Sequence, residues 1–105
     1  MESFEFNECG SCLNPNREKR ETKGHMVEVS TAEFNGKWGY GVNWMGINEG
    51  FCYGVFKDGC VFDNEHEALD AGVKELISQL SRRKVKDKQI FSELNGMMQQ
   101  ELSLF

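Results

Sequence analysis

Apolar and polar residues alternate along residues 26–34 and again along residues 37–45. A period of two is typical of a β-strand that buries one of its faces. The dipeptide Asn35-Gly36 separates the two stretches. It favours a type I′ turn, because both central residues of that turn need positive φ. The pattern therefore predicts a β-hairpin over residues 26–45.

The two-residue turn also predicts the register of the hairpin, with Phe34 opposite Lys37 and Val27 opposite Trp44. Side chains alternate across a strand, so bulky residues gather on one face and small or polar residues on the other. The bulky face is the expected core and carries Val27, Val29, Thr31, Trp38, Tyr40, Val42 and Trp44. The opposite face is expected to carry Glu28, Ser30, Ala32, Phe34, Lys37, Gly39, Gly41 and Asn43.

A third strand is expected at residues 51–56, after the turn-forming residues 46–50. Its Phe51, Tyr53 and Val55 alternate in phase with the bulky face of the hairpin. A further turn is predicted at residues 57–59. Residues 60–62 are then a candidate for a short edge strand.

A helix is predicted from Asn64 onward, where the period of the apolar residues changes. Asn64 is a favourable N-cap, Glu67 stands three residues later, and an acidic first turn suits the helix dipole. Gly72 lies on the apolar stripe. Because glycine otherwise weakens a helix, it predicts a close approach to the sheet. The stripe consists of Leu69, Val73, Leu76, Ile77 and Leu80.

A second amphipathic helix is expected after Asp87, which is a favourable N-cap. The chain continues beyond this helix to an apolar end at Leu104 and Phe105. The apolar stripe of the second helix consists of Ile90, Phe91, Leu94, Met97, Met98 and Leu102.

These elements predict an α+β fold of order βββαα, in which one helix packs on the aromatic face of an antiparallel sheet. The sheet has three strands, or four if residues 60–62 join it. Residues 1–24 combine turn formers with mixed charge and no apolar period, so we expect a flexible polar leader there. The βββα domain is expected over residues 25–83, and the second helix over residues 84–105 as an association element.

The length of 105 residues is enough for one small globular domain. We expect a cytoplasmic protein without membrane association, because no apolar run is long enough to span a bilayer and no signal-peptide pattern is present. The net charge of −5 argues against a general attraction to nucleic acid. Five of the twelve Lys and Arg residues nevertheless fall within residues 82–88.

The apolar stripe of the second helix needs a partner: the back of its own sheet, a second copy of the chain, or a different protein. Gly39, Gly41 and Gly54 would allow a close approach to the back of the sheet, but they leave little apolar area to bury there. We therefore expect a small non-enzymatic protein-interaction or regulatory module that forms a homodimer through this helix.

The alternative function is nucleic-acid binding through phosphate contacts. Over residues 25–81, three strands followed by a helix resemble the topology of the double-stranded-RNA-binding domain, and antitoxins of the HicB kind have a similar order. The first resemblance implies RNA binding by lysines at the helix start, where this chain has Asp63, Glu65 and Glu67. The candidate phosphate ligands are instead Arg82, Arg83, Lys84, Lys86 and Lys88.

A third alternative is zinc binding or thiol redox chemistry at Cys9 and Cys12, which have the spacing of a zinc half-site. A zinc site needs two more ligands, and Cys52 and Cys60 stand apart from this pair. We expect incidental thiols, no cofactor and no catalytic residue. His66 is expected to be an exposed first-turn histidine rather than part of an acid–base pair, because its neighbours Glu65 and Glu67 point away from it on a helix.

Overall fold

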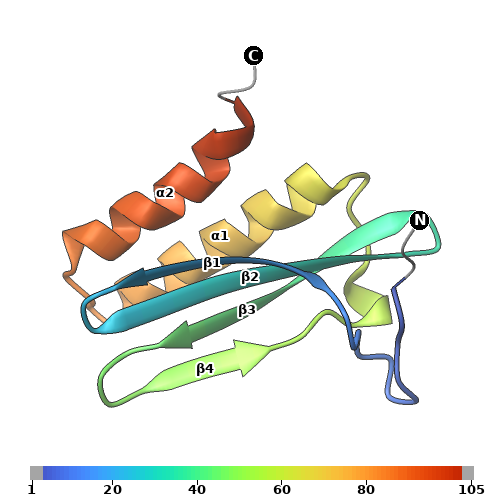
Figure 1. Cartoon of the computed structure of the whole chain (residues 1–105), viewed down its shortest axis with the longest axis horizontal. Coiled ribbons are helices and arrows are strands. Elements are labelled where there is room, and N and C mark those ends of the chain that lie inside the picture. The colour runs from blue at the N-terminus through green and yellow to red at the C-terminus, as the bar shows by residue number, and fades with distance from the viewer. Residues whose placement is uncertain (1–3, 103–105) are drawn as a thin grey trace.

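Four antiparallel strands form one sheet, in the order in which they follow each other along the chain (Figure 1). This computed structural model describes residues 4–102, and the α+β class is as predicted. The strands are β1 (Asn16–Thr22), β2 (His25–Phe34), β3 (Lys37–Met45) and β4 (Gly50–Tyr53). A 3-10 turn η1 (Lys57–Gly59) and the helices α1 (Glu65–Arg82) and α2 (Lys88–Leu102) follow.

The predicted hairpin of β2 and β3 is confirmed, together with its register. Asn35 and Gly36 have φ values of 55° and 79°, as a type I′ turn requires. Phe34 pairs with Lys37, and the pairing continues without interruption to Met26 and Met45.

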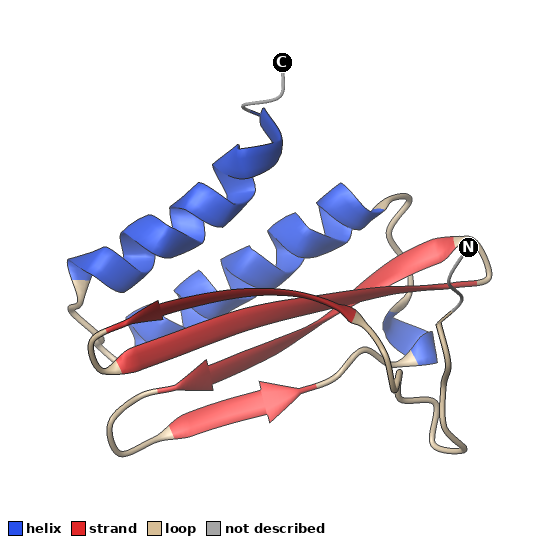
Figure 2. Cartoon of the chain, viewed as in Figure 1, coloured by secondary structure: helices blue, strands red, loops and turns tan. Residues whose placement is uncertain are grey.

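The helix α1 packs on the bulky face of this hairpin, as predicted (Figure 2). Asn64 caps the helix, since its side-chain oxygen accepts a hydrogen bond from the backbone N–H of Glu67 at 2.9 Å. Trp38 is an exception on this face, because its ring packs edge to face on Phe4. The buried residues shared by the sheet and α1 are Val27, Val29, Val42, Trp44, Leu69, Val73, Leu76 and Leu80.

The strand β4 is shorter than predicted, and this changes the position of Val55. Because the chain leaves the strand after Tyr53, the alternation of faces is broken. Val55 is buried on the back of the sheet rather than on the bulky face. The candidate strand at residues 60–62 makes a single bridge, in which Phe62 pairs with Trp38 of β3.

The back of the sheet is covered in part by loop segments rather than by a helix. A Cβ atom built on Gly41 would lie 2.5 Å from the carbonyl oxygen of Tyr53, so the connection after β4 crosses the sheet there. The N-terminal segment joins it through a bridge between Ser11 and Phe56. Together they bury a second cluster of Cys12, Ala32, Val55 and Cys60, flanked by Phe4, Phe6 and Phe34.

The prediction of a flexible leader over residues 1–24 is wrong for residues 16–22. These residues form the strand β1, and each of them pairs with a residue of β2. The inward positions of β1 are the half-buried Glu18, Arg20 and Thr22. They carry no apolar signal, because their contacts are polar. Arg20 lies 2.9 Å from Glu18 and 3.5 Å from Glu93 of α2.

The helix α2 covers β1 and β2 and lies beside α1, on the same side of the sheet (Figure 2). The expectation that its stripe associates outside the chain is corrected for three residues, because Ile90, Leu94 and Met97 are fully buried in the chain's own core. Phe91 and Met98 are half-buried against that core. The side chain of Leu102, like Leu104 and Phe105, lies outside the described residues. Within residues 4–102 no helix is long and apolar enough to cross a membrane.

The predicted close approach at Gly72 is testable by adding one methyl group. A Cβ atom there would lie 2.6 Å from Val29 Cγ1 and 3.1 Å from Tyr40 Cδ1. We expect Gly72→Ala to lower the free energy of unfolding by about 1–3 kcal/mol in urea denaturation, because overpacking outweighs the gain in helix propensity.

Gly96→Ala is the matched control, since Gly96 is an exposed position of α2 and a Cβ atom there meets nothing within 4 Å. This substitution is expected to raise the free energy of unfolding by up to about 1 kcal/mol. Equal effects of the two alanines would contradict the packing of α1 on the sheet.

Candidate interaction surface

Three connections meet at one end of the sheet: the β1–β2 turn, the β3–β4 turn and the segment between α1 and α2 (Figure 1). A Cβ atom on Gly24 of the first turn would lie 3.6 Å from Ile47 of the second. Arg83 of the third donates from Nη1 to Glu49 Oε1 at 2.7 Å. We call the residues 22–25, 46–49 and 82–88 the basic end.

The segment 82–88 has a defined conformation at the end of α1. The backbone N–H groups of Lys84 and Val85 donate to the carbonyl oxygens of Ser81 and Leu80, each at 3.0 Å. Lys84 has a φ of 60°, so this is a Schellman motif with a lysine where glycine is usual. Holding a lysine in this left-handed region costs about 1 kcal/mol.

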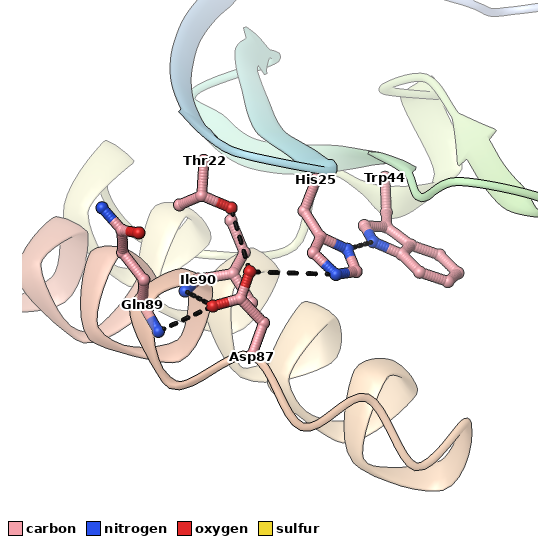
Figure 3. Close-up of polar contacts among 6 residues, drawn as sticks. All are labelled: Thr22, His25, Trp44, Asp87, Gln89 and Ile90. Atoms are coloured by element: carbon pink, nitrogen blue, oxygen red, sulfur yellow. Dashed lines mark hydrogen bonds and ion pairs between the residues drawn. The ribbon is translucent and has the colours of Figure 1, made fainter.

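The carboxylate of Asp87 fixes the start of α2, as the sequence predicted (Figure 3). Its Oδ1 accepts from the backbone N–H groups of Gln89 and Ile90 at 2.9 and 3.4 Å. Its Oδ2 accepts from Thr22 Oγ1 at 3.2 Å and lies 3.9 Å from His25 Nε2. The same side chain therefore caps α2 and ties it to the β1–β2 turn.

His25 links this cap to the core, because its Nδ1 accepts a hydrogen bond from Trp44 Nε1 at 3.2 Å (Figure 3). The two rings are nearly parallel, with their centroids 6.2 Å apart. A nitrogen that accepts carries no proton, so the neutral ring has its proton on Nε2, which faces Asp87. Nδ1, the nitrogen of the neutral ring that could accept a proton, is thus already bonded to Trp44, which argues against a role for His25 as a general base.

Arg83 differs from the other cations of the segment, because its side chain belongs to the fold. Besides its contact with Glu49, its guanidinium carbon lies 5.4 Å from the ring centres of both Trp44 and Phe51. Such cation–π contacts hold the segment against β3 and β4. The predicted phosphate ligand Arg83 therefore has structural partners already.

The remaining cations of the segment are exposed to solvent. Residues at even positions from 82 to 88 face outward, whereas Val85 packs on the core and Asp87 is half-buried. Among the described residues, no carboxylate lies within ion-pair distance of Arg82, Lys84, Lys86 or Lys88. The outward set is Arg82, Lys84, Lys86 and Lys88, and Lys23 of the neighbouring turn is also exposed.

The cysteines are distributed over separate environments. Cys9 is exposed, whereas Cys12 and Cys60 are buried in the cluster behind the sheet. Burial raises the pKa of the Cys60 thiol, with a smaller contribution from Cys12, so this thiol stays protonated at neutral pH. Within residues 4–102, no group of three or more His, Cys, Asp and Glu side chains is placed to hold a metal ion.

Shallow clefts of about 130, 220 and 260 Å³ lie elsewhere on the molecule. They are smaller than the roughly 300–1,000 Å³ typical of small-molecule sites. In the smallest, Glu65 Oε2 accepts from Asn16 Nδ2 and from Thr31 Oγ1, both at 2.8 Å. The hydrogen bonds of these polar groups are made within the fold, where they join β1, β2 and α1.

Lys84→Gly is expected to raise the free energy of unfolding by about 0.5–1 kcal/mol, because glycine adopts positive φ without strain. Urea denaturation measures the effect. Lys86→Gly removes the same charge from the same segment at a position without positive φ, and it should not stabilise. A stabilised Lys86→Gly together with an unchanged Lys84→Gly would contradict the described conformation.

Substitutions of Asp87 separate its capping role from its charge. Asp87→Ala removes both oxygens and is expected to cost about 1–2 kcal/mol, with faster amide hydrogen exchange at the start of α2. Asp87→Asn keeps an oxygen that can cap the helix, so it should cost less than half as much. Equal losses for the two variants would show that the charge, rather than the cap, holds the helix.

Comparison with known proteins assigns no function to this chain, so its function has to be inferred from the geometry of the basic end. No family model, curated protein or solved structure matches this chain. That geometry is a set of outward cations on a segment whose other residues are fixed to the fold.

Proposed function

We propose that this chain is a small non-enzymatic binding module that docks through its basic end onto the phosphate backbone of a nucleic acid. The observation that supports the proposal is the division of the segment between α1 and α2. Arg83, Val85 and Asp87 hold it in place, while the cations at even positions stay exposed. Such pre-ordering lowers the entropic cost of binding a ligand.

The chemistry of the segment favours phosphate groups over a protein surface as the ligand. Every exposed residue from 82 to 88 is a cation, and the one apolar residue, Val85, packs inward. Protein interfaces usually have an apolar core, whereas phosphate contacts need only charge and hydrogen-bond donors. The segment provides the second kind of contact.

The conformation of Lys84 adds support, since glycine would fit its backbone at a lower energetic cost. Strain of this kind points to a functional use of the side chain. Lys84 lies between the end of α1 at Arg82 and the start of α2 at Lys88, where the proposal places the ligand.

The charge of the whole molecule limits how a polyanion approaches. The net charge is −5, so the surface outside the basic end repels phosphates. Binding is therefore confined to one end, is sensitive to salt, and is weakly dependent on base sequence.

Fluorescence anisotropy with labelled single-stranded and duplex oligonucleotides of mixed sequence tests the proposal. With three or four phosphates contacted, the logarithm of the association constant should fall with the logarithm of salt concentration with a slope of about −3 to −4 on duplex. An absence of binding to both kinds of oligonucleotide at low salt would refute the proposal.

Lys86→Glu and Lys74→Glu form a matched pair, since both lysines are exposed and both changes alter the net charge equally. Lys86→Glu is expected to weaken binding about 3- to 10-fold at low salt and to reduce the salt slope by about 1. Lys74 lies on α1, away from the segment, and its substitution should have a smaller effect. Equal losses would indicate attraction by net charge alone, without a docking site.

A further inference from the structure

The two edges of the sheet differ in charge. The edge strand β1 carries five consecutive charged residues of mixed sign at residues 17–21. Charged side chains of this kind discourage an edge from pairing with another chain. The other edge strand, β4, has no charged residue, and neither do the three residues that follow it. Of the two edges, β4 is therefore the one that can accept a further strand.

Exposed apolar side chains are concentrated in the part of the chain that contains β4. Among the described residues, five of the six large apolar side chains that remain exposed lie within residues 45–61. Val61 precedes Phe62, which continues this edge by pairing with Trp38 beyond the end of β4. The five residues are Met45, Ile47, Tyr53, Phe56 and Val61, and the sixth is Leu13.

We propose that β4 pairs antiparallel with β4 of a second copy of this chain, which joins two four-stranded sheets into one of eight strands. In the described part of the chain, β4 has β3 as its one strand neighbour. Figure 1 shows it as the outermost strand, on the side of the sheet away from α2. Its outer row of backbone N–H and C=O groups is thus available for a ladder.

The absence of charge favours a second copy as the occupant. A symmetric contact sets each residue near its own counterpart or a close neighbour, so a charged strand would repel itself. Partial burial and a hydrogen bond with Tyr40 raise the pKa of Tyr53, so its phenol also stays neutral. Pairing of β4 with the charged β1 edge of another copy would instead produce an open chain of molecules.

Symmetry also restricts the register of the proposed contact. Residues directly opposite each other in an antiparallel pair face the same side of the sheet, so the two-fold axis passes through a residue pair. Centring it on Cys52 sets Phe51 opposite Tyr53 of the second copy. The two Cys52 residues then lie opposite each other, with their Cβ atoms about 4.5–5.5 Å apart.

Light scattering over a range of concentrations tests the contact. Cys52→Lys sets two like charges opposite each other at the two-fold axis, and it leaves the fold intact because Cys52 is exposed. It should raise the dimer dissociation constant at least about 10-fold, as should Tyr53→Lys. Leu13→Lys is the matched control, because Leu13 is apolar, is 59% exposed and lies outside this edge. It should leave the dissociation constant unchanged.

A short bifunctional maleimide provides the second measurement. Cys52 is exposed, so the reagent should link two chains in the wild type and in Cys9→Ser, and fail to do so in Cys52→Ser. A chain that is monomeric at all concentrations would overturn the proposal. A dimer that tolerates both lysine variants, or that crosslinks through Cys9, would also overturn it. Neither measurement involves nucleic acid, so its outcome is independent of the proposed function.

Discussion

Asn35 and Gly36 set the alignment of the two longest strands, and the rest of the fold depends on that alignment. Both residues adopt positive φ, which closes the hairpin with two residues and leaves one register. A slip by one residue would turn every side chain of β3 to the opposite face. Trp44 would then leave the core, and the glycines at 39 and 41 would face α1 instead of the connection after β4. The layers on both sides of the sheet therefore follow from one turn.

Elements that bury an apolar face could be predicted from the sequence, whereas elements held by polar contacts could not. The hairpin and both helices showed their periods directly, and Gly72 indicated the close approach of α1. The strand β1 gave no such signal, because its inward residues bind through charge to Glu93 and through Thr22 to Asp87. Without β1 the sheet is one strand too narrow to cover both helices. The stripe of α2 was therefore expected to need a partner outside the chain.

The candidate site was visible as composition but not as geometry. The run of cations is plain in the sequence, and so is Asp87 as a cap. No local pattern indicates that Arg83 would bind Glu49 and pack on two aromatic rings, because these contacts join residues more than thirty positions apart in the sequence. Nor does a period reveal that Lys84 adopts positive φ. These features depend on the meeting of three connections at one end of the sheet, which is a property of the assembled fold.

The two proposed surfaces are compatible because they occupy different parts of the molecule. The basic end lies where β4 begins, whereas the pairing edge runs along β4 and past it to Phe62. In an antiparallel pair the starts of the two β4 strands point in opposite directions, so a dimer would carry its two basic ends apart. Each end alone offers a few phosphate contacts, which is a weak attachment at physiological salt. Two basic ends joined by a continuous sheet would bind one long polyanion more tightly than one end does. The gain in affinity would come from their fixed separation rather than from new contacts. Dimerisation would thus compensate for the small number of cations that an acidic chain of this size can hold on one surface.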